Sequence, residues 1–336
     1  MKKIAVFVLL VLLISPLFGD VTFTDSLGRV RTIKKVERVI AAGRPAEMMI
    51  AALNPELLVG ITYQMTETTE KFFPYMKGLP LFGKFYGAKS NLNREALIMA
   101  DPDVIIDIGE IKDGISEDLD RLEKETGIPV VFIESYLENT PTALRKLSTL
   151  LGTEEKGEVL ASFAEETIAR GKRTRESVGK EKSIYYSPSE DALLTYPAGS
   201  FHTESIKLAG GKNVIDGKFQ EGGGKVTLEE LFMLSPEYII LSNEKAYEIV
   251  KSDKKWALLD AVGNNHVYKI PSVPYSFVDA PPALNRLIGI DWLSKLLYPE
   301  ENKDLDVKER VREFYRLFYN YDLSGEELDE ILEDSL

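Results

Sequence analysis

The sequence predicts an α/β protein made of two Rossmann-like lobes with mostly parallel sheets, joined by a long rigid helix. Three observations predict this class. Short Val/Ile-rich segments alternate with helical segments in residues 36–134, and the same plan returns in residues 182–299. A stretch with helical periodicity lies between these halves. One segment of the first half also matches a segment of the second half in sequence.

The first residues have the layout of a secretory signal peptide. Two lysines precede an apolar run over residues 4–14, and a Ser-Pro pair breaks that run shortly before Gly19. An N-terminal membrane anchor is the alternative, but this run is short for a hydrocarbon core about 30 Å thick. We therefore expect segment 1–19 to be a signal peptide that is cleaved near Gly19, and the mature chain to be exported.

Residues 20–140 are expected to form the N-terminal α/β lobe. Its strands are predicted where β-branched residues cluster, at 38–42, 57–62, 103–109 and 129–134. Its helices are predicted between these runs, at 45–53, 94–99 and 115–126. Continuous Val/Ile runs separated by helices are typical of parallel strands that are covered on both faces.

Residues 141–180 are expected to form a helical connector, with helices over 141–151 and 154–178 interrupted at Gly152. Acidic residues open the longer helix and basic residues lie near its end, which suits the helix dipole. About 25 residues at 1.5 Å each span about 37 Å, enough to cross from one lobe to the other. This length predicts a stiff hinge.

Residues 181–299 are expected to form the C-terminal α/β lobe, with strand candidates at 183–187, 237–242 and 266–270. Residues 300–336 have the pattern of a helical tail. An amphipathic helix is followed there by a capping-box pattern at 324–327. The apolar residues that should pack this tail onto a lobe are Phe314, Leu317 and Phe318.

Two matching segments, 93–106 and 227–240, lie 134 positions apart. Each copy has the pattern of a capped short helix, a proline stop and a buried strand. The identical pairs are Glu95/Glu229, Leu97/Leu231, Met99/Met233, Pro102/Pro236, Ile105/Ile239 and Ile106/Ile240. The repeat places Glu95 or Glu229 in the first helical turn of each half. On the residues alone, helix-dipole complementarity explains this placement, and a pair of symmetric docking charges is the functional alternative.

Composition and motifs argue against several functions. A formal net charge of −13 disfavours a nucleic-acid partner, and zero cysteines exclude disulfides and thiolate metal sites. The glycine-rich segment 222–225 ends in Lys225 but continues with Val226, so it lacks the Ser or Thr of a phosphate-binding loop. There is no nucleophile elbow, and the two histidines lack a metal-ligand spacing. We therefore predict no cofactor, no directly bound metal and no catalysis, with an exported α/β enzyme as the alternative class.

Aromatic and polar side chains gather after the predicted strands. Ligands of parallel α/β sheets bind beyond the carboxyl ends of strands, where these segments should meet. Arg44, beside the exposed amides of a helix start, would suit an anionic group. His202 lies in a loop that runs into a helix, which leaves a site role open, whereas His266 is interpreted as a strand-edge residue. The candidate ligand-binding residues are Arg44, Tyr63, Phe85, Tyr86, Tyr186, Tyr196, Phe201, His202 and Tyr275.

Motifs in a fixed order carry a family resemblance over nearly the whole mature chain. They occupy residues 24–29, 37–40, 91–106, 127–131, 208–214 and 256–271. Their order and spacing resemble the periplasmic substrate-binding proteins that serve bacterial ABC importers for ferric siderophores, haem and vitamin B12. The resemblance implies a periplasmic protein of two lobes with a ligand cleft between them. It also implies that Glu95 and Glu229 match the paired glutamates that meet arginines on the membrane permease, which makes docking the favoured role.

The resemblance also bears on the ligand. Residues 280–293 and 298–300 are similar to a subgroup that handles iron or haem, while related proteins bind molybdate or tungstate. A ferric siderophore carries anionic oxygens and apolar bulk, which suits Arg44 with Tyr and Phe, whereas a bare oxyanion would want a smaller, donor-rich site. We therefore expect a monomer that captures an iron(III) complex, a siderophore or haem, and delivers it to the permease. Binding of molybdate, tungstate or cobalamin by the same fold is the alternative.

Overall fold

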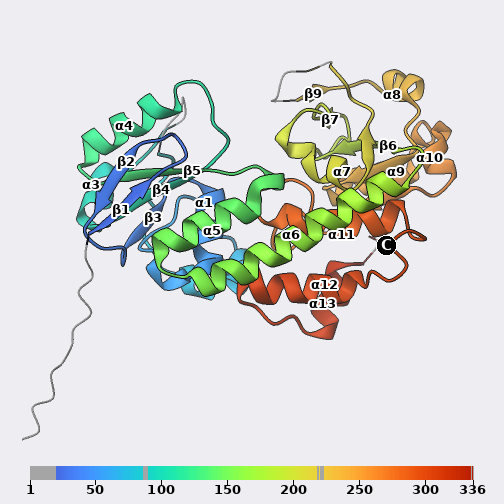
Figure 1. The fold of residues 1–336 in the computed structure, drawn as a ribbon. Coiled ribbons are helices and arrows are strands. Elements are labelled where there is room, and N and C mark those ends of the chain that lie inside the picture. Colours follow the sequence, from blue (N-terminus) through green and yellow to red (C-terminus); the bar gives the residue numbers. More distant parts are fainter. Residues whose placement is uncertain (1–19, 86–89, 218, 220–222, 334, 336) are drawn as a thin grey trace, which may run out of the picture.

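Two separate parallel sheets form the centres of two lobes in the computed structural model, which describes all residues except 1–19, 86–89, 218, 220–222, 334 and 336 (Figure 1). The expected signal peptide and Tyr86 thus lie outside the described residues. The first sheet has the order β3 (Val39–Ala41), β4 (Val104–Gly109), β5 (Val130–Glu134). The second has the order β11 (Val267–Lys269), β10 (Tyr238–Leu241), β6 (Lys182–Ser187), β8 (Gly211–Asn213). The predicted class, two lobes with mostly parallel sheets, is confirmed.

The inner strands β4 and β10 explain why the sequence has continuous apolar runs. Each lies between two neighbours in its sheet, and β10 is buried along its whole length. In β4 only Gly109, the last residue, is not fully buried. Strands that are covered on both faces cannot alternate polar and apolar residues.

The strand that the sequence predicts over residues 57–62 is absent as a regular element. Leu58 forms only an isolated parallel bridge with Val39 at the edge of the first sheet. The ring of Phe82 packs directly against Gly60, where a Cβ atom would lie 2.0 Å from Phe82 Cε2. The segment therefore runs along the sheet edge without forming a continuous strand. At position 60 the ring of Phe82 leaves no room for a Cβ atom, so this position requires glycine.

Short antiparallel pairs extend both lobes, and the sequence patterns did not predict them. β1 (Val21–Thr24) pairs with β2 (Val30–Ile33) in the first lobe, and β7 (Leu194–Thr195) pairs with β9 (Gly224–Lys225) in the second. The side chain of Asp25 closes the first hairpin by accepting from the amides of Leu27 at 2.9 Å and Arg29 at 3.0 Å. Ser26 N then donates to Phe132 O at 2.8 Å, which ties the hairpin to β5.

Helices cover the sheets. In the first lobe they are α1 (Arg44–Leu53), α2 (Glu67–Phe72), α3 (Arg94–Met99) and α4 (Ile115–Thr126), with the 3-10 turns η1 (Pro55–Leu57) and η2 (Pro74–Met76). In the second lobe they are α7 (Glu204–Leu208), α8 (Leu228–Leu234), α9 (Glu244–Ser252) and α10 (Asp260–Gly263), with η4 (Phe201–Thr203) and η5 (Trp256–Leu258). The predicted helices 45–53, 94–99 and 115–126 correspond to α1, α3 and α4.

The sequence repeat is also a structural repeat. Leu97 in α3 and Leu231 in α8 are completely buried and anchor their helices to the two sheets. Both helices are followed by a residue in the left-handed region, Asp101 at φ +46° and Ser235 at φ +42°. That conformation is uncommon for residues other than glycine, so its recurrence at matching positions indicates one shared local design.

A layer of helices joins the two lobes. η3 (Leu137–Asn139) and α5 (Thr140–Leu151) lead into α6 (Glu154–Ser177), whose 24 residues span about 36 Å at 1.5 Å each. Figure 1 shows α6 passing from one lobe to the other, with α11 (Asn285–Leu297) and α12 (Val307–Phe314) near it. The π-helical turn η6 (Tyr315–Tyr319) and α13 (Gly325–Ile331) complete the chain. The predicted long connecting helix is confirmed.

A buried ionic cluster fixes the helices of this layer. Asp291 of α11 is completely buried and accepts from Arg170 Nε of α6 and Arg310 Nε of α12, both at 2.9 Å. Arg310 Nη2 also donates to Thr167 Oγ1 at 2.7 Å, and its guanidinium carbon lies 3.8 Å from the ring centroid of Phe163. One carboxylate thereby links three helices.

The C-terminal tail packs against both the connector and the first lobe. Phe163 of α6 contacts Phe318 with ring centroids 5.4 Å apart. Beyond η6, Asn320 Nδ2 donates to Ala51 O of α1 at 3.2 Å. Lys71 of α2 forms an ion pair with Glu327 at 2.7 Å. The middle of the tail therefore returns to the first lobe, and its end lies against α11, where Trp292 Nε1 donates to Ser335 O at 3.0 Å.

Candidate ligand site between the lobes

The first half of the candidate site is built at the start of α1. Gly43 precedes the helix and Pro45 lies in its first turn, where the missing N–H removes no helical hydrogen bond. Arg44 Nη1 donates to the hydroxyl of Tyr275 at 2.9 Å. The guanidinium carbon lies 4.5 Å from the ring centroid of Tyr63 and 5.5 Å from that of Tyr275, so cation–π attraction holds Arg44 in place. Because Tyr275 belongs to the second lobe, this contact joins the lobes.

A buried carboxylate lies one helical turn beyond Arg44. Glu47 is 4% exposed and accepts from Thr62 N at 3.0 Å and Thr62 Oγ1 at 3.1 Å. Burial raises the pKa of Glu47, whereas the bonds from Thr62 and the charge of Arg44 act in the opposite direction. Glu47 therefore offsets part of the Arg44 charge from within the protein.

The second half of the site is centred on His202 in η4. Its Nδ1 contacts Asp279 Oδ1, and the ring of Tyr196 stacks on the imidazole at 3.9 Å between centroids. The hydroxyl of Tyr186 donates to Asp279 Oδ2 at 2.8 Å, and burial raises the pKa of Tyr186 well above its usual range. Asp279 is only 2% exposed. This contact directs Nδ1 toward Asp279 and thereby orients the imidazole ring.

A pocket of about 160 Å³ adjoins both halves, because its lining includes Pro45, next to Arg44, and Phe201, next to His202. Its first wall follows the segments after β3, β4 and β5, and its second wall comes from η4, the loop before α11 and the start of α11. The lining residues are Pro45, Gly109, Glu110, Lys112, Ser135, Phe201, Pro282 and Arg286. This position, beyond the carboxyl ends of parallel strands, is where α/β sheets bind ligands.

Cations from both lobes border the pocket. Lys112 Nζ of the first lobe lies 5.2 Å from the ring centroid of Phe201 in the second. Arg286 is 5% exposed and donates through Nη1 to Phe201 O and Glu204 Oε2, both at 2.6 Å. Burial lowers the pKa of Arg286, and Glu204 counteracts this effect. Glu204 also accepts from Leu137 N at 3.2 Å, a second bond between the lobes.

Most of the sequence-predicted contacts gather in this interlobe region. Arg44, Tyr63 and Tyr275 form one group beside Pro45, and Tyr196, Phe201 and His202 form the other. Both groups adjoin residues that line the pocket. Their contact with a ligand stays a prediction.

Three predicted contacts, Phe85, Tyr86 and Tyr186, do not belong to these two groups. Phe85 is 3% exposed and belongs to a first-lobe core cluster with Phe82 and Leu97, because this apolar ring packs inward. Tyr186 is completely buried and supports Asp279 instead of lining the pocket. Tyr86 lies outside the described residues. In this structure Phe85 is a core residue and Tyr186 supports Asp279; a ligand contact by either stays a prediction.

Sequence reasoning missed four charged residues of the site: Glu47, Lys112, Asp279 and Arg286. Lys112 follows the predicted strand 103–109, so the strand-end rule that selected Tyr63 could have selected it as well. The other three lie in helices or a proline-rich loop, and no local pattern marks their side chains as buried in the fold.

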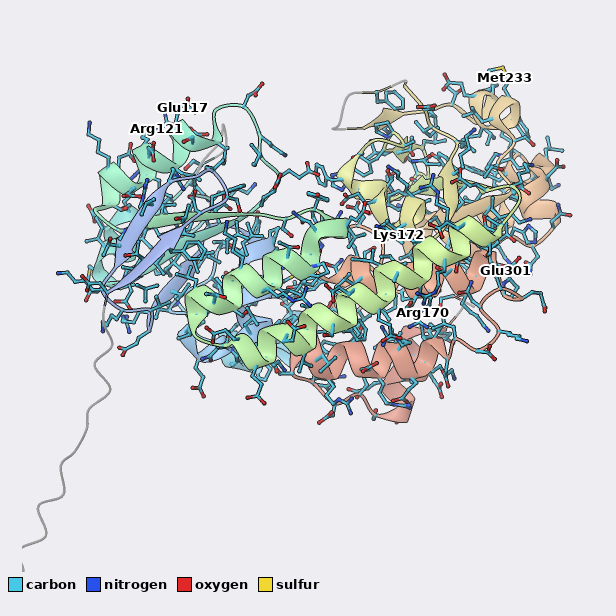
Figure 2. All side chains as sticks on the ribbon, in the orientation of Figure 1. Glu117, Arg121, Arg170, Lys172, Met233 and Glu301 are labelled. Carbon is cyan, nitrogen blue, oxygen red and sulfur yellow. The ribbon has the colours of Figure 1, made fainter. Side chains whose placement is uncertain are left out.

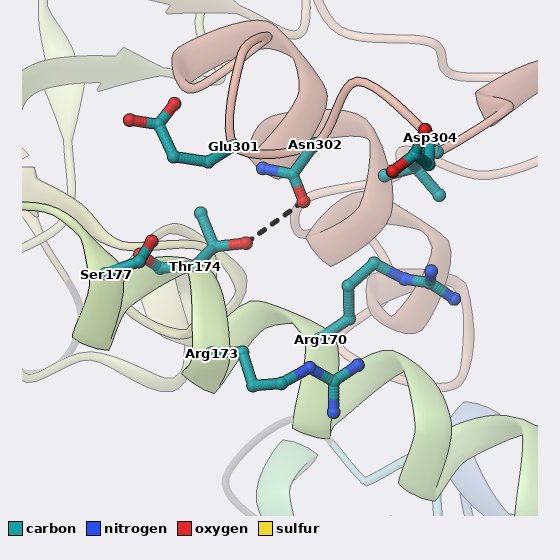
Figure 3. A pocket seen from close by; sticks show the side chains of 8 residues that line it. Arg170, Arg173, Thr174, Ser177, Glu301, Asn302 and Asp304 are labelled. Atoms are coloured by element: carbon teal, nitrogen blue, oxygen red, sulfur yellow. Dashed lines mark hydrogen bonds between the residues drawn. The ribbon is translucent and has the colours of Figure 1, made fainter.

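A larger pocket of about 340 Å³ lies on α6, away from the strand ends (Figure 3). Its polar groups serve helix packing: Thr174 Oγ1 donates to Asn302 Oδ1 at 3.0 Å, and Arg170 binds Asp291. Its lining residues come from α6 and the segment after α11, not from the strand ends of either lobe. In the part of the chain that the structure describes, no group of three or more acidic or histidine side chains could hold a metal ion. No helix of that part is long and apolar enough to cross a membrane.

A family model described as periplasmic binding protein matches residues 84–274, more than half of the chain. The chain therefore belongs to the periplasmic binding protein family. It is similar to the uncharacterized ABC transporter substrate-binding lipoprotein YvrC of Bacillus subtilis, with 23% identity over 84% of this chain and 87% of the relative. It is also similar to the molybdate-binding protein MolA of Haemophilus influenzae, with 23% identity over 69% of this chain and 71% of MolA.

Among solved structures, an ABC transporter solute-binding protein from Sulfurospirillum deleyianum is similar over 93% of this chain and 99% of that protein. The TM-score is 0.84 and the sequence identity 29%. Together with the fold and the family match, these relatives identify the chain as a periplasmic solute-binding protein of an ABC transporter. Proteins of this class bind a small solute and work with a membrane permease.

Proposed function

We propose that this protein captures an iron(III) complex, a siderophore or haem, in the interlobe pocket and delivers it to the permease. The observation that carries this proposal is a set of cations from both lobes beside aromatic rings. Arg44, Lys112 and Arg286 supply the charge, and Tyr63 and Phe201 supply flat apolar surface. A ferric siderophore presents anionic oxygens together with apolar bulk, and this combination matches both features.

His202 supports the metal-complex part of the proposal. A buried carboxylate, Asp279, occupies Nδ1 and thereby sets the orientation of the ring. Histidines that ligate metals almost always donate their second nitrogen to such a partner. This role departs from the sequence-based expectation of no directly bound metal: we propose that Nε2 of His202 completes the coordination of an iron ion that its chelator leaves partly open.

A molybdate or tungstate oxyanion is the second candidate. Two observations favour it: the similarity to MolA, and a pocket of about 160 Å³. Pockets for organic ligands usually measure about 300–1,000 Å³, so a siderophore, haem or cobalamin would need the lobes to move apart. A small oxyanion would fit the present spacing.

Calorimetric titration of the purified protein tests these alternatives. The ligands are a ferric catecholate siderophore, haem, cyanocobalamin, molybdate and tungstate, with intrinsic fluorescence as a second signal. We expect saturable binding of the ferric siderophore or haem, and weaker binding by the His202→Ala variant. Binding of molybdate or tungstate alone would reject the iron proposal in favour of the oxyanion.

We propose that the site binds its ligand without chemical change. Mass spectrometry of the ligand released from the complex should return the molecule that was added. Turnover that disappears when a pocket residue such as Lys112 is replaced would instead support the exported-enzyme alternative.

Glu95 and Glu229 are proposed to dock the protein on the permease. Both side chains are exposed, and each lies at the same position of the structural repeat. The double variant E95A/E229A should retain ligand affinity but lose uptake. A matched control is E117A/E301A, which removes two exposed glutamates that lie outside the repeated helices α3 and α8 (Figure 2). Equal uptake by both double variants would remove the docking role.

The protein is further proposed to act as a periplasmic monomer after loss of residues 1–19. N-terminal sequencing of the exported protein and sedimentation velocity measure these two properties. A retained N-terminus or a stable dimer would contradict them.

A further inference from the structure

The most exposed large apolar side chains in the described part of the chain are Met99 at 85% and Met233 at 79%. They are identical positions of the structural repeat, one on each lobe. Met48, Met49 and Met76 are buried, and this burial is the usual behaviour of methionine in a folded protein. Two solvent-exposed methionines at equivalent places therefore need an explanation other than chance exposure.

Helix geometry explains how each methionine is presented. Leu97 and Leu231 are completely buried, and a residue two positions later points about 200° away around the helix, toward solvent. Figure 2 shows Met233 at the outer edge of α8. The fold thus directs both methionines outward by anchoring the leucine two residues before each.

The same geometry places an acidic residue beside each methionine. Glu95 and Met99 are four residues apart, as are Glu229 and Met233, so each pair shares one exposed helix face. Within the described residues, neither glutamate has an ion-pair partner; Arg94, next to Glu95, pairs with Glu125 at 2.8 Å. Each lobe therefore carries a matched patch made of one free carboxylate and one flexible apolar side chain.

Further apolar side chains enlarge the two patches. Ile98 is exposed beside Met99, and Phe232 and Leu234 are exposed beside Met233. Unbranched methionine adapts its shape to the surface it meets, which suits a contact that must form and release repeatedly.

We infer that Met99 and Met233 are apolar anchors that insert into two equivalent sockets of the importer's permease, each socket lying beside a basic residue that faces the neighbouring glutamate. A patch that occurs twice, once per lobe, fits a partner that presents the same surface twice, which requires a two-fold symmetric contact face on the permease. Charge would guide the encounter, and burial of the methionines would hold the complex. This inference rests on the proposed docking function and adds the residues that give it affinity.

The experiment measures binding to the cognate importer reconstituted in lipid nanodiscs, at several salt concentrations. The variants are M99S/M233S, E95A/E229A and the control L258S, which removes an apolar side chain of 72% exposure from another surface. We expect M99S/M233S to bind about tenfold more weakly or worse at every salt concentration, with an unchanged salt dependence. E95A/E229A should instead flatten the salt dependence, and L258S should bind like the wild type.

The outcomes separate this inference from the docking proposal. If M99S/M233S binds like the wild type while E95A/E229A is weakened, the methionine anchors are refuted and docking by the glutamates stands. If M99S/M233S is weakened while E95A/E229A binds like the wild type, the methionine anchors are supported and docking by the glutamates is refuted. If the wild type is a dimer that M99S/M233S dissociates in sedimentation velocity, a second copy covers the patches and the inference is overturned.

Discussion

Replacing Asp279 with asparagine tests whether a buried carboxylate prepares His202 for its ligand. Asp279 is 2% exposed and accepts from the hydroxyl of Tyr186 at 2.8 Å while its other oxygen contacts His202 Nδ1. Asparagine keeps the shape but is neutral and offers one acceptor and one donor. If its NH2 group faces His202, Nδ1 must become an acceptor; if it faces Tyr186, the hydroxyl must accept instead of donate, and in both cases the negative charge beside His202 is lost. Loss of such a partner weakens metal affinity about 10- to 100-fold, or about 1.4–2.7 kcal/mol.

The assay is calorimetric titration with the ferric ligand, combined with thermal unfolding. D279N should bind 10- to 100-fold more weakly and should lose about 1–3 kcal/mol of stability, because hydrogen bonds to a buried charged acceptor are replaced by weaker bonds to a neutral amide. Y185F is the matched control, since it removes the hydroxyl of the neighbouring buried tyrosine, which donates to Ala192 O at 2.8 Å, and leaves Asp279 and His202 in place; its affinity should stay within about twofold of the wild type. If D279N binds within twofold of the wild type, the orienting role is refuted.

Three further perturbations probe the charges of the protein. Arg44→Ala should weaken an anionic ligand about tenfold, more at low salt than at high salt, by calorimetry; equal affinity at both salts would contradict a charge contribution. Asp291→Ala leaves two arginines without their shared buried carboxylate and should cost about 3–5 kcal/mol in urea unfolding, whereas the exposed-pair variant Glu158→Ala should cost less than about 1 kcal/mol. Because the pKa of Glu47 is raised in the folded protein, its charged form opposes folding at neutral pH; Glu47→Gln should therefore be more stable than the wild type at pH 8, and this gain should disappear as the pH falls below the ordinary carboxyl pKa. A gain that stayed constant with pH would show that Glu47 is not the titrating group.

Local sequence patterns predicted the parts of the fold that depend on local physics. The Val/Ile run 103–109 contains β4, and the periodic stretch 154–178 contains α6. Both were predictable because burial on two faces and helical periodicity each produce a continuous pattern of apolar residues in the sequence. The repeat was visible for the same reason: a cap, a buried leucine and a proline stop recur at fixed spacing. Elements of two to four residues, such as β7 and β9, are too short to produce a recognisable pattern of apolar residues.

The candidate site was only partly predictable, because its decisive contacts join distant parts of the chain. Arg44 and Tyr275 lie 231 positions apart, and His202 and Asp279 lie 77 apart. The expectation that ligands bind beyond the carboxyl ends of parallel strands placed Arg44, Tyr63 and Tyr275 in one region without showing that they touch. It also selected Phe85, because an aromatic residue after a glycine has the same local pattern whether its ring turns toward a cleft or toward the core.

The return of the C-terminal tail to the first lobe limits how the molecule can move. The ring of Tyr275 lies 5.7 Å from that of Phe73 in the first lobe and 6.3 Å from that of Tyr319 in the tail, measured between centroids. A wide hinge opening of the two lobes would break this aromatic contact as well as the ionic cluster around Asp291. We therefore expect ligand binding to tilt the two lobes only slightly. The distance between the patches on α3 and α8 would change with this tilt, and the importer would detect from that distance whether the site is occupied.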